Sequence, residues 1–270
     1  MHESIKNRNS DEIKNQVFIE LTDKELFEIL KDINLSDFVK YNTENWKSCL
    51  NKIIQDNPKV KEALLYIINN YKKKRKHNPD KFGYMHCIEA TSLMAEHWFD
   101  NPDEIAAALL HDVREDIPNW EKYLKSTYNE NIVNLVKSLT EKDKSWYTRE
   151  EGKSSRQERK SEEMEKVLHF SPNELALKLA DQISNIAETV NDIEKLTPED
   201  RQRYWESFNA GYDKQIWKYD TLSDIIEKRI QTCKDENLFK NEDEEIKLKS
   251  FHDKFKYLVN KLKWITSHTK

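Results

Sequence analysis

Residues 101–116 read NPDEIAAALLHDVRED, and this stretch decides the fold class. Asn101 and Pro102 mark the start of a helix, since proline is tolerated in the first helical turn. The run from Ile105 to Leu110 is apolar on every side of such a helix, which is typical of a buried segment. The sequence therefore predicts a central helix over Asp103–Glu115 that ends in charged and imidazole side chains.

Composition supports an all-α fold. The 270 residues include only three glycines and six prolines. Sheets with tight hairpins need glycine at positive-φ turns, so this scarcity argues against an all-β protein. Lys, Glu and Leu are abundant and favour helices. We therefore expect an all-α protein.

Apolar residues recur at helical spacing in further segments. A polar N-terminal stretch precedes them, and residues 77–85, HNPDKFGYM, read as a loop because Pro and Gly interrupt the periodicity. Helices are expected over Thr22–Ile33, around Trp46–Ile54, over Val60–Tyr71, His86–Trp98 and 131–140, over Glu174–Val190 with Ser171 as its cap, and in two or three segments beyond Pro198. We expect a helical extension over residues 1–55, a core over 56–200, and C-terminal helices over 201–270 that pack on the core.

Charge and cysteine content exclude several classes of function. The charged fraction is 35% but the net charge is only −5, so no basic excess indicates DNA or RNA as a partner. No apolar run approaches the roughly 18–20 residues that span a bilayer, and the N-terminus lacks the apolar region of a secretory signal. Three widely spaced cysteines fit reduced thiols. We expect a cytoplasmic protein, with Cys87 as a small buried apolar residue.

Four positions suggest a metal site. His86 opens a helix, His111 and Asp112 follow an apolar run 25 residues later, and Asp181 lies in a further apolar helix. Mixed imidazole and carboxylate ligands suit manganese, iron or zinc, and a bound cation offsets the cost of burying carboxylates. Each position alone has a simpler interpretation: His86 as a core histidine, or Asp181 paired with Lys178 on a helix surface. The ordered set favours the metal site.

The same residues carry a resemblance to a known family. ALLHDVRED (108–116) and LKLADQISNI (177–186) resemble segments of HD-type metal-dependent phosphohydrolases, in particular the hydrolase domain of the RelA/SpoT alarmone enzymes and the small alarmone hydrolases. The resemblance covers residues 75 to about 190 and implies a single HD-domain helical fold. It implies a manganese ion held by His86, His111, Asp112 and Asp181.

The resemblance also implies roles around the metal. Glu115 and Asp116 would position and activate the attacking water. Arg75 and Lys76 would contact substrate phosphates, and Asn185 would line the nucleotide pocket. The pair Arg159-Lys160 resembles a basic segment that the family places before its last ligand. From the residues alone, the lysines of segment 72–77 could equally be a solvated helix end, and Asn185 could be a local polar contact of Asp181.

This chain departs from the family at several positions outside the ligand set. Cys87 replaces the proline that usually follows the first ligand histidine. Gln182 replaces a basic residue that often follows the last ligand, and Ala187 replaces an arginine. Residues 142–159 read as an insertion. The departures affect the substrate-binding residues more than the metal ligands.

The resemblance implies hydrolysis of the 3′-pyrophosphate of guanosine tetra- or pentaphosphate (ppGpp or pppGpp), giving GDP or GTP and pyrophosphate. One alternative is an HD phosphohydrolase that acts on another phosphorylated nucleotide, such as a phosphomonoester. A second is a non-catalytic nucleotide-binding module, against which the pair Glu115-Asp116 argues. A phosphorylated guanine nucleotide is the expected partner, and the C-terminal aromatic helices could form a homo-oligomer interface.

Overall fold

The computed structural model describes residues 30, 43–75, 81–97, 101–117, 119–139, 160–207 and 211–267. Side chains are described for these residues except 43–49, 115, 116 and 207. Within the described part, secondary structure is helical apart from one isolated antiparallel bridge between Lys74 and Phe82. The all-α prediction is confirmed. Among the helices described, none combines the length and apolarity needed to cross a bilayer.

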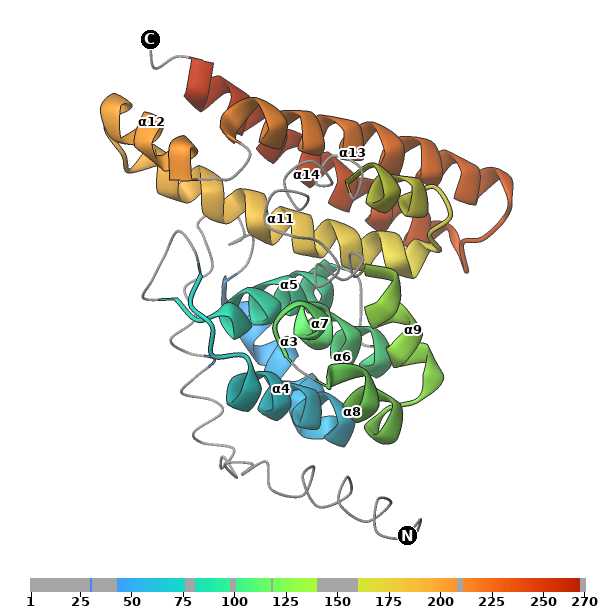
Figure 1. The fold of residues 1–270 in the computed structure, drawn as a ribbon. Coiled ribbons are helices and arrows are strands. Elements are labelled where there is room, and N and C mark those ends of the chain that lie inside the picture. Colours follow the sequence, from blue (N-terminus) through green and yellow to red (C-terminus); the bar gives the residue numbers. More distant parts are fainter. Residues whose placement is uncertain are drawn as a thin grey trace, which may run out of the picture.

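The helices form two layers (Figure 1). The first layer contains α3 (Thr43–Asp56), α4 (Pro58–Asn70), α5 (Gly83–His97), α6 (Pro102–Leu110), α7 (Val113–Asp116), α8 (Trp120–Thr127) and α9 (Glu130–Leu139). The second contains α11 (Pro172–Glu194), α12 (Pro198–Ser207), α13 (Gly211–Asp235) and α14 (Glu242–Ser267). Residues 160–167 are also helical.

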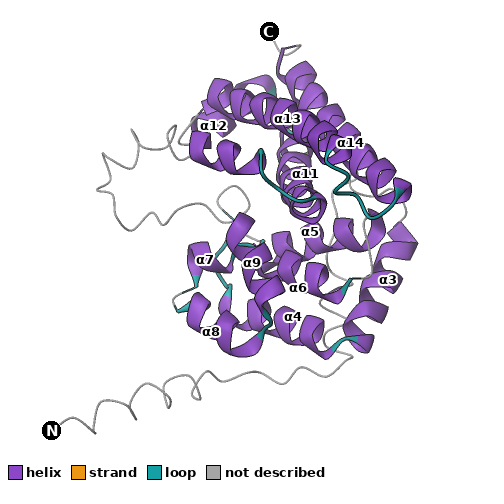
Figure 2. Cartoon of the chain, turned by 90° about the vertical axis from the view of Figure 1, so that its right-hand side faces the viewer, coloured by secondary structure: helices purple, strands orange, loops and turns teal. Residues whose placement is uncertain are grey.

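Helix α11 joins the two layers. It packs against α5 on one side and against α14 on the other, and Figure 2 shows it between the two groups of helices. Its start follows the prediction: the Ser171 side chain accepts from the Glu174 amide, the Glu174 carboxylate accepts from the Ser171 amide, and Pro172 occupies the first turn. Buried residues face both neighbours, so a side chain on α11 can reach the core of the first layer.

The predicted helix over Asp103–Glu115 is wrong in one respect. Helix α6 ends at Leu110, a turn occupies His111 and Asp112, and α7 begins at Val113. The His111 ring donates from Nδ1 to the Ala108 carbonyl at 2.7 Å, so this carbonyl has a side-chain partner. The Asp112 amide hydrogen-bonds to the Cys87 sulfur instead. Because two side-chain groups bind the backbone here, the apolar pattern alone did not reveal the break.

A short pairing fixes the chain before α5. The Arg75 amide donates to the Lys81 carbonyl at 2.8 Å, and the Gly83 amide donates to the Lys73 carbonyl at 2.7 Å. Gly83 allows this approach, because a Cβ at this position would come within 2.5 Å of the Tyr71 ring. Arg75 and Lys81 are therefore held side by side at the start of α5.

Some predictions fall on residues outside this description. The helix over Thr22–Ile33 lies there apart from Leu30, which is buried and helical. The insertion at 142–159 also lies outside the described residues. The division at residues 55 and 200 stays a prediction. Cys87 is fully buried, as predicted.

Candidate metal centre

The structure brings His86, His111, Asp112 and Asp181 together. His86 comes from the first turn of α5, the pair His111-Asp112 from the turn after α6, and Asp181 from the middle of α11. Ligand atoms of the two histidines and Asp112 lie within 4.8 Å of one another. The Asp181 Oδ1 lies 3.2 Å from His86 Nε2 and 3.7 Å from His111 Nε2. Three separate helical segments thus converge on one point.

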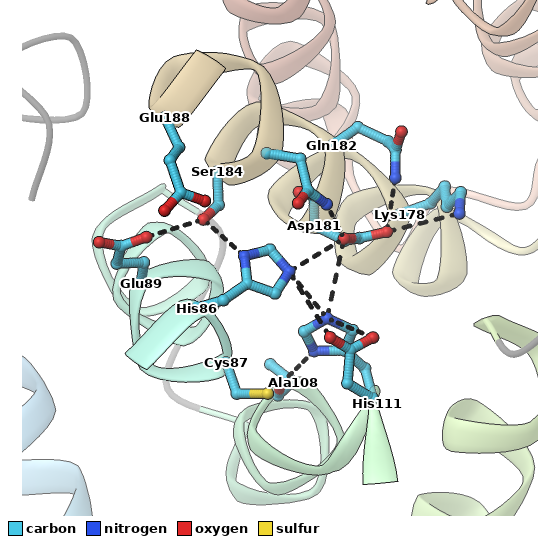
Figure 3. A network of polar contacts seen from close by, with 12 residues as sticks. His86, Cys87, Glu89, Ala108, His111, Lys178, Asp181, Gln182, Ser184 and Glu188 are labelled. Carbon is cyan, nitrogen blue, oxygen red and sulfur yellow. Dashed lines mark hydrogen bonds and ion pairs between the residues drawn. The ribbon is translucent and has the colours of Figure 1, made fainter. Parts of the chain in front are cut away.

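Both imidazoles present Nε2 to this point. The His111 Nδ1 donates to a backbone carbonyl, and the His86 Nδ1 lies 2.9 Å from the Ser184 hydroxyl. The two Nε2 atoms are 3.3 Å apart, and His111 Nε2 is 3.4 Å from Asp112 Oδ1. Figure 3 shows His86 between Ser184 on one side and Asp181 and His111 on the other. Both histidines are at most 5% exposed, whereas the Asp112 and Asp181 side chains are 22% and 16% exposed.

This donor set fits a divalent cation. In their neutral form the two imidazoles direct Nε2 lone pairs at each other and at carboxylate oxygens. Four acceptors at such distances repel one another unless a proton or a cation lies among them. The pKa of His111 is raised: burial lowers it, but the carboxylates of Asp112 and Asp181 outweigh the burial. The cluster therefore stabilises positive charge, and imidazole with carboxylate is the ligand chemistry of a borderline transition metal.

Asp181 is held from several sides. Its Oδ1 accepts from Asn185 Nδ2 at 2.7 Å, and its Oδ2 accepts from Gln182 Nε2 at 2.6 Å and from Lys178 Nζ at 3.4 Å. Burial raises the pKa of Asp181, but Lys178 and the two imidazoles outweigh it and hold the pKa well below its ordinary value. The carboxylate is ionised and fixed in orientation. The ion pair with Lys178 considered from the sequence does exist, but Lys178 is buried and Asp181 is half-buried, so the pair does not lie on an open helix surface.

A buried ion pair lies next to Asp181. Lys178 is 3% exposed and donates to Glu163, whose other carboxylate oxygen accepts from Lys160 at 2.6 Å. Burial raises the pKa of Glu163, yet Lys178 and Lys160 bring it well below its ordinary value. Burial and the same two lysines lower the pKa of Lys218 on α13 to about 7. This side of the cluster is rich in ammonium groups.

Two of the residues predicted to contact substrate contact each other. The Arg75 Nη2 donates to Asn185 Oδ1 at 2.9 Å, and its Nε and Nη2 donate to Glu188 at 3.1 and 2.6 Å. Asn185 in turn donates to Asp181. The local polar contact, which the sequence left open for Asn185, is therefore present. Burial lowers the pKa of Arg75, but Glu188 more than compensates and raises it above its ordinary value.

Four predicted residues have side chains that the structure does not describe. Lys76 and Arg159 lie outside the described residues, and Glu115 and Asp116 belong to α7 but their side chains are not described. Lysines 72, 73 and 74, before Arg75, are exposed.

Sequence reasoning missed the residues behind the ligands. Ser184 and Glu188 lie three and seven positions after Asp181, on the same face of α11, and Glu89 lies three positions after His86 on α5. All three are polar residues on largely apolar helix faces. That spacing was the available signal, because positions three, four and seven apart share a helix face.

The chain is similar to known proteins in family and in sequence. The family model described as "HD domain" matches residues 63–210, more than half of the chain. The guanosine-3′,5′-bis(diphosphate) 3′-pyrophosphohydrolase MESH1 of Xenopus tropicalis is 28% identical over 153 residues, which cover 55% of this chain and 78% of that protein. The protein of the same name from Drosophila melanogaster is 28% identical over 150 residues, with 54% and 79% coverage.

A solved structure supports the fold. The crystal structure of lmo0812 from Listeria monocytogenes EGD-e matches with a TM-score of 0.50 and 24% identity. The match covers 67% of this chain and 99% of that protein. At this level of identity the match supports the arrangement of the helices.

Proposed function

This chain belongs to the HD domain family, and we propose that it is a metal-dependent phosphohydrolase that removes the 3′-pyrophosphate of guanosine tetra- or pentaphosphate. The products would be GDP or GTP and pyrophosphate. One observation carries the proposal: the buried His86 and His111 meet the partly buried Asp112 and Asp181 in a cluster that favours a cation. The names of two curated relatives indicate the substrate.

We propose that the four residues of the cluster bind one divalent ion, with Mn²⁺ as the physiological metal. Two imidazole ligands support manganese or another transition ion over magnesium, which prefers oxygen ligands. When bound, the ion supplies Lewis-acid activation of the phosphoryl group and of the attacking water. Asn185, Gln182 and Lys178 keep the Asp181 carboxylate oriented toward the ion site.

Residues of α7 and of the basic segment complete the proposal. Glu115 and Asp116 follow the ligand pair by one helical turn, where a carboxylate can orient a water and accept its proton. Lysines 72–74 together with Lys76 would attract a substrate with several phosphates. Arg75 is already paired with Glu188, so we assign it to shaping the pocket beside Asn185 as well as to phosphate contact.

The test is a substrate assay. Purified protein is incubated with guanosine 3′,5′-bis(diphosphate) and Mn²⁺, and the nucleotide products and pyrophosphate are separated by ion-exchange chromatography. We expect equal amounts of GDP and pyrophosphate, and neither product from the Asp181→Asn variant. Release of orthophosphate from a nucleotide phosphomonoester, without attack on the 3′-pyrophosphate, would instead support the alternative phosphohydrolase. Nucleotide binding without turnover would support a non-catalytic module.

A further inference from the structure

A hydrogen-bond network of polar side chains lies behind the metal cluster and connects His86 to Asp181. It begins at His86 Nδ1, which lies 2.9 Å from Ser184 Oγ. The Ser184 hydroxyl donates to Glu89 at 3.1 Å, and Glu89 accepts from Lys81 at 2.7 Å. Lys81 lies 3.2 Å from Glu188 as well. All five groups are at most 16% exposed, and His86 alone among them is a ligand candidate.

The second half of this hydrogen-bond network leads from Glu188 back to the cluster. Glu188 accepts from both Nε and Nη2 of Arg75, and the same Nη2 donates to Asn185 Oδ1 at 2.9 Å. Asn185 Nδ2 then donates to Asp181 Oδ1 at 2.7 Å. The network therefore forms a closed ring, since the Asp181 Oδ1 lies 3.2 Å from His86 Nε2.

The direction of each hydrogen bond follows from the groups involved. Lysine and arginine only donate, and an ionised carboxylate only accepts. The Ser184 hydroxyl has one hydrogen, and Glu89 takes it. His86 must therefore donate from Nδ1 to Ser184, which leaves the Nε2 lone pair directed at the cluster. At the other end, Arg75 orders Asn185 with its amide nitrogen toward Asp181.

We propose that Ser184 and Glu89 are positioning residues that fix His86 in the Nδ1–H tautomer and so set the affinity of the cluster for its metal ion. Lys81 and Glu188 extend this network to Arg75 and Asn185. Groups that accept from the distal nitrogen of a ligand histidine hold its ring and tautomer, and their loss costs roughly 10–100-fold in metal affinity. Here Ser184 accepts from His86, and Glu89 accepts from Ser184 and so keeps the hydroxyl in the accepting orientation.

Ser184→Ala is the first variant, because it removes one oxygen from a buried site and leaves the helix intact. Mn²⁺ binding is measured by titration calorimetry on the metal-free protein, and we expect affinity to fall by roughly 10–100-fold. Ser184→Thr keeps the hydroxyl and should recover much of the affinity. The matched control is Ser92→Ala on α5, which deletes a buried hydroxyl that donates only to the Ile88 carbonyl at 2.7 Å. This control should bind Mn²⁺ as the parent does.

The inference rests on the proposed metal site, so a second readout tests it without metal. Nitrogen-15 NMR of histidine-labelled, metal-free protein distinguishes protonated Nδ1 from protonated Nε2. We expect Nδ1–H for His86 in the parent and a mixture of tautomers in Ser184→Ala and Glu89→Gln. A parent that binds no Mn²⁺ contradicts the proposed function, whatever the tautomer. Unchanged tautomer and unchanged affinity in Ser184→Ala would overturn the positioning role alone.

Discussion

The Arg75 guanidinium donates to the side-chain oxygen of Asn185 at 2.9 Å, although the two residues are 110 positions apart. The family resemblance implied that both residues contact the substrate. In the structure they form the last links before Asp181, and Arg75 is also paired with Glu188. A guanidinium with two protein partners is less available to a phosphate than one that projects into solvent. Arg75 therefore has a structural role that must be separated from any contact with substrate.

We predict that Arg75→Ala weakens Mn²⁺ binding, because Asn185 loses the donor that orients it toward Asp181. The expected loss is roughly tenfold or more, as for other partners of metal ligands. Calorimetric titration measures it, and kcat/KM is measured for the tetraphosphate and for a simple phosphate ester. Arg75→Lys keeps the charge but not the fork geometry and should not restore binding. A rise in KM for the tetraphosphate alone, with unchanged metal affinity, would show that Arg75 acts on substrate only.

Removal of metal ligands gives the next prediction. His111→Ala and Asp112→Ala should lose bound Mn²⁺ and activity, measured by elemental analysis and by the substrate assay, while far-ultraviolet circular dichroism stays helical. Chelator treatment of the parent should abolish turnover, and Mn²⁺ should restore it better than Mg²⁺, since imidazole suits the softer ion. Full metal occupancy in both variants would contradict the ligand assignment.

The proposed role of Glu115 and Asp116 in activating water predicts a loss of turnover without a loss of metal. Glu115→Gln and Asp116→Asn keep the size of the side chain but lose the charge that accepts a proton. Turnover should fall by roughly a hundredfold or more, while Mn²⁺ content remains that of the parent. If both variants keep parental activity, another group activates the water.

The sequence predicted the parts of the molecule that depend on local pattern. The start of α11 at Ser171-Pro172 and the apolar face that carries Asp181 follow from capping and helical spacing, and both are confirmed. The contact of Ser184 with Glu89, which spans 95 positions, could not be predicted. Spacing within one helix shows which residues share a face, but not which residue of another helix meets them.

The end of α6 before His111 could not be predicted from the sequence for a related reason. A helix propagates through hydrogen bonds between backbone groups, and apolar periodicity records only which side chains are buried. At His111 the imidazole binds the Ala108 carbonyl, and the following amide binds Cys87 of another helix. The interruption depends on a partner 25 positions away. It places His111 and Asp112 in a turn that faces α11.

The buried pair of Lys178 and Glu163 gives a prediction on stability. Glu163→Gln removes the carboxylate to which the buried Lys178 ammonium donates, and breaking one partner of a buried pair costs about 3 kcal/mol or more. Urea denaturation measures the free energy of unfolding. The double variant Glu163→Gln/Lys178→Met removes the uncompensated charge and should recover part of the loss.

The control for this pair is Glu121→Gln. Glu121 is 44% exposed and pairs with Lys125 and Lys137 on the surface, where an ion pair contributes about 1 kcal/mol or less. Equal losses for Glu163→Gln and Glu121→Gln would mean that the buried lysine finds another partner or releases its proton.

The contact between α5 and α14 predicts a dependence of stability on pH. The His97 side chain is 28% exposed, and its Nε2 lies 3.4 Å from the Lys254 ammonium. Burial first, and Lys254 second, lower the pKa of His97 from 6.5 to about 4. Between pH 6.5 and about pH 4, His97 is protonated in the unfolded chain but neutral in the folded protein. Stability is therefore unaffected by His97 above pH 6.5 and falls as pH decreases through this window.

The size of this effect follows from the two pKa values. At pH 5 the proton costs the folded state about 2 kcal/mol, less the screening that the exposed part of the ring receives. Urea denaturation between pH 7.5 and 5 should show parent stability falling more steeply than that of His97→Gln, which has no proton to gain. His169→Gln, which replaces an exposed histidine, is the matched control. Parallel pH profiles for the parent and His97→Gln would mean that the ring is protonated in the folded protein despite Lys254.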